Sequence, residues 1–245
     1  MKGYKHIVVS GCSFTAPNPK CLINSGETYG DLISDYLGAK CYNLAVGGGS
    51  LSSMNRKVFE WCGKNMNKFE DTLIILGVTN IDRVEFWSNK KDGWFDDKPD
   101  WPFPQILQVD ISDEIGWSLK ERKKYFIKFY NENAVFITAI NILVGLQSFF
   151  KLNNIDHIFF DAMYPIDEYW ETWCDDKYDL RGYKLLFDNL VSQENWYKHP
   201  EYKSLQYLTS NNIEMRKSIR DEHPNKKAHK YWANCLIEFM ENKDG

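Results

Sequence analysis

The chain has 245 residues, of which 43% are hydrophobic and 26% are charged, and its formal net charge is -4 at neutral pH. These proportions are typical of a soluble globular protein with enough apolar side chains for one large core. Because acidic and basic residues are interspersed and the net charge is negative, we expect neither a nucleic acid nor a membrane surface as a partner. Aromatic residues make up 16% of the chain and include nine Trp.

The sequence gives no indication of export or of membrane insertion. The apolar stretch at residues 7–9 is too short for the core of a signal peptide. The stretch at 134–150 contains four polar residues, whereas a membrane span needs about 20 predominantly apolar ones. We therefore predict a buried helix there. The six cysteines form no CxxC pair, which favours reduced thiols in a cytoplasmic protein over a disulfide scaffold or a zinc site.

The first third of the chain repeats one pattern three times: a β-branched strand, a glycine turn and a helix. The predicted strands are 6–10, 40–46 and 72–76. A helix is predicted over 28–37, ending at Gly38, and a second begins at Ser50 or Ser52. Strands that alternate with helices in this way favour right-handed βαβ units and a parallel sheet.

The remainder of the chain is less regular. We predict an aromatic insertion at about 84–117 and a fourth strand over 156–163. Between them, a helical pattern over 118–152 indicates either one long helix or two helices with a break near Gly145. A second insertion at about 164–205 precedes a short strand at 205–208 and a terminal helix over 226–240. The predicted fold is a single domain, 1–245, with three α/β/α layers and a flavodoxin-like parallel sheet of four to five strands.

Three groups of residues at predicted strand ends could carry chemistry. Ser13 lies in a glycine turn directly after the first strand, Gly47–Gly49 end the second strand, and Asn80 follows the third. Ligands of open α/β sheets bind at the carboxyl ends of the strands. A serine exposed there can act as a nucleophile, and backbone N–H groups and an amide can stabilise an oxyanion. Taken singly, each residue could instead be a turn or cap residue.

The segment before the terminal helix contains Asp221 and His223. A base beside a nucleophile, itself oriented by a carboxylate, forms a catalytic triad. Residues two apart on an extended backbone point to the same side, so this pair could act together. The alternative is that Asp221 caps the helix and His223 is a surface residue.

Together these residues resemble the four sequence blocks of the SGNH/GDSL hydrolase superfamily. Residues 11–15 (Gly-Cys-Ser-Phe-Thr) resemble the Gly-Asp-Ser block, 43–48 (Asn-Leu-Ala-Val-Gly-Gly) the second, Asn80 the third, and 221–224 the Asp/His block. The motifs span the chain, and they look closest to uncharacterised SGNH-like proteins of tailed bacteriophages. The resemblance implies Ser13 as nucleophile, His223 as base with Asp221, and an oxyanion hole of Ser13, Gly48 and Asn80, without metal or organic cofactor.

The chain departs from the family pattern at three positions. Cys12 stands where the family has Asp; Asn80 follows Gly77 by three residues instead of two; and Asp221 precedes His223 by two residues instead of three, with Arg220 at the family's Asp position. The last departure leaves two alternatives, a Ser13–His223–Asp221 triad or a Ser13–His223 dyad.

The resemblance predicts an esterase for a small-molecule or carbohydrate ester, and the Trp-rich insertions could stack on sugar rings. The alternative function is a degenerate binding module for a glycan or a protein partner, for which an irregular Asp/His block would be typical. Two other side chains are weaker candidates. For His229, a packing or capping role is favoured over metal binding. The side chain of Cys12 is expected to point into the core.

Overall fold

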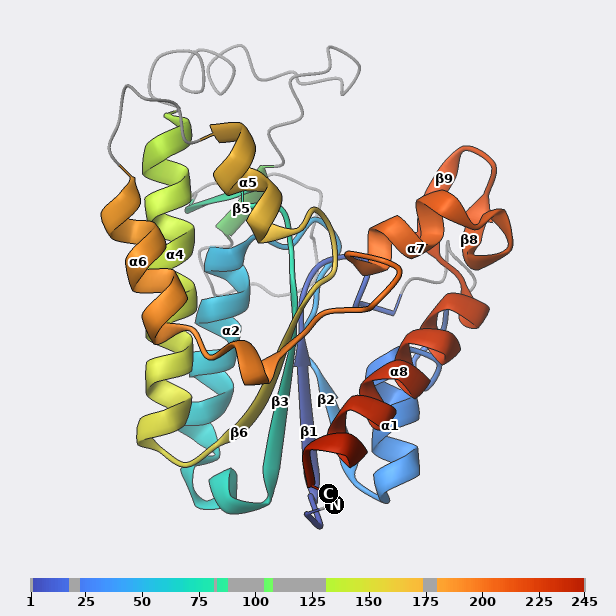
Figure 1. Ribbon diagram of the computed structural model, residues 1–245. Helices are drawn as coiled ribbons and strands as arrows, with labels where there is room; N and C mark the ends of the chain where they lie inside the picture. Colours follow the sequence, from blue (N-terminus) through green and yellow to red (C-terminus); the bar gives the residue numbers. More distant parts are fainter. Residues whose placement is uncertain are drawn as a thin grey trace.

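The protein has a five-stranded parallel sheet with helices on both faces (Figure 1). This computed structural model describes residues 2–17, 23–81, 83–87, 104–107, 131–173 and 180–244. The sheet order is β2-β1-β3-β6-β7, which is the flavodoxin-like order. The predicted α/β/α class with a parallel sheet of four to five strands is therefore confirmed. The strands are β1 (His6–Ser10), β2 (Lys40–Asn43), β3 (Thr72–Val78), β6 (Asp156–Asp161) and β7 (Trp196–Tyr197).

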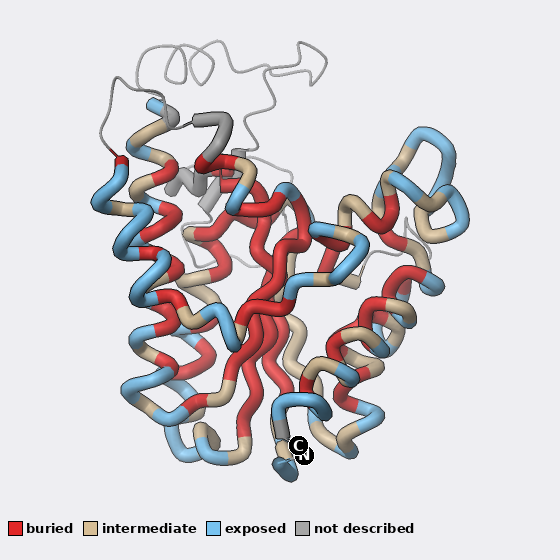
Figure 2. The backbone as a smooth tube through the Cα atoms, in the orientation of Figure 1, coloured by how far each residue is buried: buried red, intermediate tan, exposed pale blue. Residues whose placement is uncertain are grey.

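Two helical layers enclose the sheet (Figure 1). One layer contains α2 (Leu51–Lys64), α4 (Glu132–Leu152) and α6 (Arg181–Leu190), and the other contains α1 (Tyr29–Leu37) and α8 (Lys226–Asp244). Side chains alternate along β1, so Val8 joins the core under α2 and α4 while Ile7 and Val9 join the core under α1 and α8. Figure 2 shows the buried residues concentrated in the strands and on the inner sides of the helices.

The smaller elements lie around this sandwich. Among the described residues they are α5 (Ile166–Trp173), α7 (Leu205–Asn211), the antiparallel pairs β4 (Val84–Trp87) with β5 (Pro104–Leu107) and β8 (Arg216–Ser218) with β9 (Asp221–Pro224), and the short 3-10 helices η2 (Met66–Asp71), η3 (Gln193–Asn195) and η4 (Ile213–Met215). Of the first predicted insertion, β4 and β5 are described and the remainder lies outside the described residues. The single-domain organisation stays a prediction.

One local prediction is wrong. The segment 205–208 is the start of helix α7, because the Ser204 side chain accepts the Tyr207 N–H at 3.1 Å and Leu205, Leu208 and Thr209 are buried at helical spacing. Of the two alternatives for the long helical pattern, the single helix is the one observed: α4 continues through Gly145 without a break, and the first part of the pattern, 118–130, lies outside the described residues. The fifth strand is instead β7, which pairs with β6 inside the second predicted insertion.

Helix α4 is long and apolar enough over Asn133–Leu152 to cross a membrane, judged by length and composition alone. Its inner side is nevertheless part of the core: Phe136, Leu143 and Phe150 are at most 1% exposed and lie in the cluster that also contains Val8 and Phe159 of the sheet. Apolar residues spaced three and four apart on one side are typical of a core helix. The described structure therefore agrees with the predicted buried helix.

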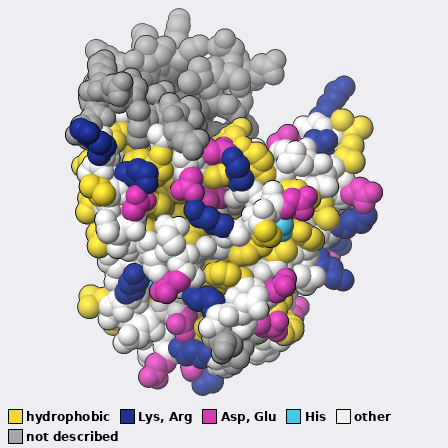
Figure 3. Space-filling model, viewed as in Figure 1, with side chains coloured by type: hydrophobic (Ala, Val, Ile, Leu, Met, Phe, Trp, Pro, Cys, Tyr) yellow, Lys and Arg dark blue, Asp and Glu magenta, His cyan; other side chains and the backbone are white. Residues whose placement is uncertain are grey.

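Acidic and basic side chains are interspersed over the face of the molecule seen in Figure 3. Exposed ion pairs of the protein include Lys184 with Asp188 at 2.6 Å and Lys198 with Asp167 at 2.7 Å. Exposed pairs of this kind contribute little to stability. The expected absence of nucleic-acid and membrane partners stays a prediction.

Candidate active site

Ser13 lies in a tight turn that follows β1. The N–H groups of Thr15 and Ala16 both donate to the Cys12 carbonyl at 2.9 Å, which closes the turn around Ser13. A side chain at Gly11 would place its Cβ 2.3 Å from Thr15 Oγ1 and 3.1 Å from the Gly77 carbonyl oxygen. Only glycine fits at position 11, where the chain after β1 passes close to the end of β3. Ser13 itself is half-buried.

Neighbouring side chains hold this turn in place. The Tyr29 hydroxyl donates to Thr15 Oγ1 at 3.1 Å, and Asn43 Nδ2 donates to the Thr15 carbonyl at 3.0 Å. The Cys12 side chain is fully buried in the core beneath α1 and α8, as expected. A thiol in that position does not face the surface where a substrate would bind.

The start of α8 is fixed next to the start of α1. Lys226 Nζ contacts Glu27 Oε1 at 2.5 Å, and the Tyr29 N–H donates to His229 Nδ1 at 3.2 Å. Asn225 Oδ1 accepts the N–H groups of Lys227 and Ala228, so Asn225 caps the helix and not Asp221. Because α1 follows the Ser13 turn, these contacts bring the segment before α8 over Ser13.

His223 lies between Ser13 and Asp221. His223 Nε2 is 2.9 Å from Ser13 Oγ, and His223 Nδ1 is 2.6 Å from Asp221 Oδ1. The ring also packs on Phe14, with ring centroids 5.2 Å apart. An ionised carboxylate only accepts, so Nδ1 carries the proton and Nε2 is the free acceptor that faces the Ser13 hydroxyl. This is the hydrogen-bond order of a Ser–His–Asp triad.

Asp221 is held by more than the imidazole. Its Oδ1 also accepts the His223 backbone N–H at 3.1 Å, and its Oδ2 contacts Lys217 Nζ at 2.9 Å. Partial burial alone would raise the pKa of Asp221, but the hydrogen bonds from Lys217 and His223 outweigh it and lower that pKa to about 2. Asp221 therefore stays ionised wherever His223 needs a carboxylate partner.

The other charged residues of this segment face elsewhere. Glu222 Oε2 accepts hydrogen bonds from Ser210 at 2.8 Å and from Gln206 at 3.5 Å, both on α7. Arg220, which stands at the family's Asp position, is exposed at the β8–β9 turn. Asp221 is thus the carboxylate that contacts His223 among the described residues, in spite of its shorter spacing.

The glycine loop after β2 approaches the Ser13 turn. The Val46 N–H donates to the Gly11 carbonyl at 3.4 Å, and a Cβ on Gly49 would lie 2.8 Å from that same carbonyl oxygen. Gly48 has φ +72°, a conformation that favours glycine. The loop therefore needs Gly48 for its backbone conformation and Gly49 for its close approach.

Asn80 follows β3 at the same edge of the sheet and is buried. Its Oδ1 accepts the Tyr164 N–H at 3.4 Å, which turns the Nδ2 donor away from Tyr164. In the part of the chain that the structure describes, neither Asn80 Nδ2 nor the N–H groups of Ser13 and Gly48 have a hydrogen-bond acceptor. These are the three donors that the sequence assigns to an oxyanion hole.

Arg83 was not singled out by the sequence, although it belongs to this edge. It is only 5% exposed, and its Nη1 donates to Thr79 Oγ1 at 2.9 Å and to the Gly49 carbonyl at 3.4 Å. The guanidinium therefore links the Asn80 turn to the glycine loop. A single Arg after a strand has no spacing signal, so only the three-dimensional structure could reveal this contact.

Three solved structures share this fold. The psychrotrophic esterase EstA from Pseudoalteromonas sp. aligns with a TM-score of 0.52 at 9% identity over 97% of both chains. TesA aligns with 0.52 at 7% identity over 97% of this chain and 98% of its own. The acetyl xylan esterase Est2A from Butyrivibrio proteoclasticus aligns with 0.53 at 12% identity over 98% of this chain and 64% of its own. The sequence itself matches no known protein family and no curated protein.

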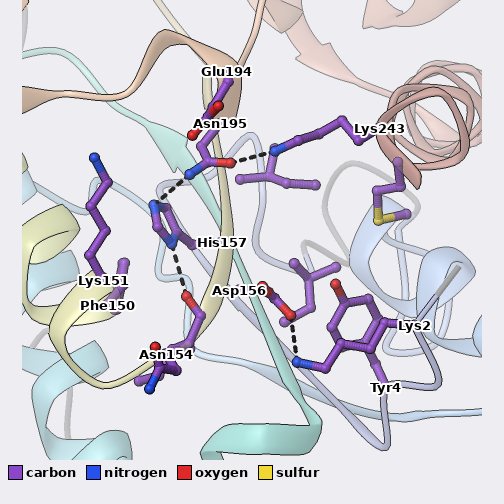
Figure 4. Close-up of a pocket in the computed structure, with 14 residues that line it drawn as sticks. Lys2, Tyr4, Phe150, Lys151, Asn154, Asp156, His157, Glu194, Asn195 and Lys243 are labelled. Carbon is purple, nitrogen blue, oxygen red and sulfur yellow. Dashed lines mark hydrogen bonds and ion pairs between the residues drawn. The ribbon is translucent and has the colours of Figure 1, made fainter. Parts of the chain in front are cut away.

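A cavity of about 490 Å³ lies at the end of the sheet away from Ser13, near the amino ends of β3 and β6 (Figure 4). Its most buried polar residue is His157, whose Nδ1 is 3.0 Å from the Ile155 carbonyl and whose Nε2 is 3.1 Å from Asn195 Nδ2. Asn195 Oδ1 in turn accepts from Lys243. Both ring nitrogens of His157 thus have hydrogen-bond partners, and neither Ser13 nor His223 lines this cavity. In the described ranges, no three His, Cys, Asp or Glu side chains could hold a metal ion.

The buried His229 is expected to make the folding stability depend on pH. It is 1% exposed, and burial lowers its pKa to about 4 while its Nδ1 accepts the Tyr29 N–H. Between pH 6.5 and 4 the unfolded chain takes up a proton that the folded protein does not, so folding stability falls as pH falls through this window. We expect a loss of about 3 kcal/mol from this residue. His229→Asn keeps an acceptor for Tyr29 but does not titrate.

Urea unfolding of both proteins at pH 7, 5.5 and 4.5 tests this expectation. Wild type should lose its stability advantage over His229→Asn as the pH falls. Asp161, whose pKa burial raises to about 7, has the opposite pH dependence, but it is present in both proteins and cancels in the comparison. A constant difference across the three pH values would contradict a buried neutral His229.

Proposed function

We propose that this protein is a serine ester hydrolase of the SGNH type, with Ser13 as nucleophile, His223 as general base and Asp221 as the carboxylate that orients it. The observation that carries the proposal is the continuous hydrogen-bond chain from Ser13 Oγ through both ring nitrogens of His223 to Asp221, at 2.9 and 2.6 Å. A nucleophile within reach of a base that a third group orients is the geometric signature of such a site.

In the proposed mechanism, Ser13 Oγ attacks the ester carbonyl carbon while His223 Nε2 takes the hydroxyl proton. The charge that develops on the carbonyl oxygen is stabilised by the Ser13 and Gly48 N–H groups and by Asn80 Nδ2, which lack acceptors among the described residues. His223 then returns the proton to the leaving alcohol, and the acyl group stays on Ser13. Water, deprotonated by His223, then attacks the acyl-enzyme carbonyl; as the bond to Ser13 Oγ breaks, His223 returns the proton to Oγ, and the carboxylic acid is released.

The second candidate is a binding module without turnover. An irregular Asp/His block would favour that function, and the two-residue spacing of Asp221 and His223 is irregular for the family. The contacts that Asp221 makes with His223 favour the hydrolase instead, because they orient the base despite the short spacing. A binding module would not need Nε2 to face a serine hydroxyl.

We further propose that the substrate is an O-acyl ester of a carbohydrate or of another small molecule. The support is the fold, which this chain shares with an acetyl xylan esterase, and the aromatic composition of the chain. The side chains of the first Trp-rich insertion lie outside the described residues. The resemblance to bacteriophage proteins, and with it a role in a host cytoplasm, stays a prediction.

A fluorophosphonate probe tests the proposed function directly, because only an activated serine attacks phosphorus. We expect the wild-type protein to be labelled once, on the peptide that contains Ser13, as measured by mass spectrometry. The same protein should hydrolyse p-nitrophenyl acetate, and pre-labelling should abolish this activity. Absence of labelling from pH 6 to 9 in folded protein would leave the binding module as the better proposal.

A further inference from the structure

The β8–β9 hairpin brings a cation to the triad. Lys217 Nζ lies 2.9 Å from Asp221 Oδ2, while Oδ1 of the same carboxylate accepts from His223. The pairing of the two strands shifts by one residue, so Glu222 and His223 of β9 lie opposite the single residue Lys217 of β8. Bulges of this kind re-aim side chains. This one places Lys217 and His223 on the two oxygens of one carboxylate.

We propose that Lys217 is a positioning residue of this site: it fixes the Asp221 carboxylate in the orientation that His223 needs, and its charge weakens the stabilisation of protonated His223. The inference rests on the proposed function, in which His223 alternates between neutral and protonated forms. The four groups Ser13, His223, Asp221 and Lys217 then act as a linear chain, in which each of the two ends is a proton donor.

The physical argument is that one carboxylate serves two cations during turnover. When His223 holds the Ser13 proton, Asp221 stabilises the imidazolium. Lys217 places a second positive charge on the same carboxylate, and this charge opposes the build-up of positive charge on the imidazole during turnover. Lys217 and Asp221 side chains are 31% and 30% exposed, and solvent therefore screens the effect to a modest size. In return, the second hydrogen bond prevents the carboxylate from rotating away from His223.

Several other charged groups around this hairpin have partners of their own. On α8 and its start, Lys226 pairs with Glu27, Lys227 with Glu214, and His229 accepts from Tyr29. Glu222 contacts α7. The remaining ones are Arg216 on β8, Arg220 at the turn and Lys230 on α8. Among the ion pairs that the structure gives for Asp221, the lysine partner is Lys217. A change of charge at Lys217 should therefore act on His223 through the carboxylate that both contact.

Three variants separate charge from hydrogen bonding. Lys217→Arg keeps both, Lys217→Gln keeps a donor without the charge, and Lys217→Met removes both. We expect the acid limb of the pH profile of fluorophosphonate labelling to move to higher pH by about half a unit in Lys217→Gln and in Lys217→Met. In Lys217→Arg the acid limb should stay at the wild-type pH. The plateau rate should fall about tenfold in Met, because Asp221 can then rotate, and less in Gln.

A second readout does not depend on activity. The titration midpoint of the His223 ring resonance, assigned by its loss in His223→Ala, should move upward by the same amount in Gln and Met. Lys227→Met is the matched control: it removes one lysine charge from an exposed pair with Glu214 next to the same hairpin, and it should leave both midpoints unchanged. Circular dichroism verifies that each variant is folded.

The outcomes are distinguishable. Midpoints that stay at the wild-type value in Lys217→Gln overturn the inference, as does a shift of equal size in Lys217→Arg or in Lys227→Met. Lower rates with unmoved midpoints in all three Lys217 variants would mean a structural contact only, and would also overturn it. If wild type is never labelled, the proposed function fails, while the resonance titration still decides whether Lys217 acts on His223.

Discussion

Ser13→Ala is expected to abolish ester hydrolysis and fluorophosphonate labelling. In the proposed mechanism the alanine leaves no atom to form the acyl-enzyme, and loss of the nucleophile in serine hydrolases of this kind lowers kcat by about 10⁶-fold. The fold should be unaffected, because Ser13 is half-buried and, among the described residues, its side chain is hydrogen-bonded to His223 alone. The free energy of unfolding should change by about 1 kcal/mol or less. Ester kinetics and thermal unfolding measure the two effects.

Cys12→Ala is the matched control for this prediction. Cys12 precedes Ser13 in the same turn, carries a potential nucleophile and is fully buried in the core. Its loss removes packing and lowers stability by about 1–2 kcal/mol, but hydrolysis at a temperature where the variant is folded should remain near wild type. If the Cys12 variant were inactive and the Ser13 variant active, the nucleophile would be the thiol and the proposed mechanism would be wrong.

The central sheet was predictable because its strands carry strong local signals. β1 and β3 have apolar centres, a glycine follows β1 and another lies near the end of β3, and Thr28 and Gly38 limit α1 as cap residues. The two-residue strand β7 is different, since it is too short to show a pattern and is held by tertiary contacts. Trp196 stacks on Phe159 of β6 with the ring planes 9° apart and donates to Asp161 at 3.1 Å. The 205–208 segment was misassigned because its helical spacing spans barely one turn.

The site was predictable only where residues stand in motifs. The sequence motifs named Ser13 and His223, which the structure brings to 2.9 Å. No motif could show that Lys217 reaches Asp221 or that Arg83 joins the two loops, because those contacts depend on a strand bulge and on the crossing of separate loops. The family spacing would have placed the carboxylate at Arg220. The bulge explains how a carboxylate one residue later still meets the imidazole.

Asp221→Asn distinguishes a triad from a dyad. The single amide oxygen of asparagine would face three donors: the His223 N–H, His223 Nδ1–H and Lys217, which the two carboxylate oxygens now satisfy. If the oxygen turns to Lys217, the amide NH₂ faces Nδ1 and forces the imidazole into the tautomer with its proton on Nε2, which cannot accept from Ser13. In another Ser–His–Asp enzyme this change lowers kcat by about 10⁴-fold, and we expect a loss of about 10³-fold or more here.

The comparison with His223→Ala decides the assignment. Loss of the base should be nearly as damaging as loss of Ser13, because nucleophile and base act as one unit and their effects do not add. A triad predicts that the steady-state hydrolysis rate of Asp221→Asn is close to that of His223→Ala. Circular dichroism verifies that both variants are folded. A dyad predicts that Asp221→Asn keeps most of the activity while His223→Ala has none. Because Glu222 is held by α7, it cannot replace Asp221 without breaking those contacts. Glu222 should therefore not compensate for the missing carboxylate in Asp221→Asn.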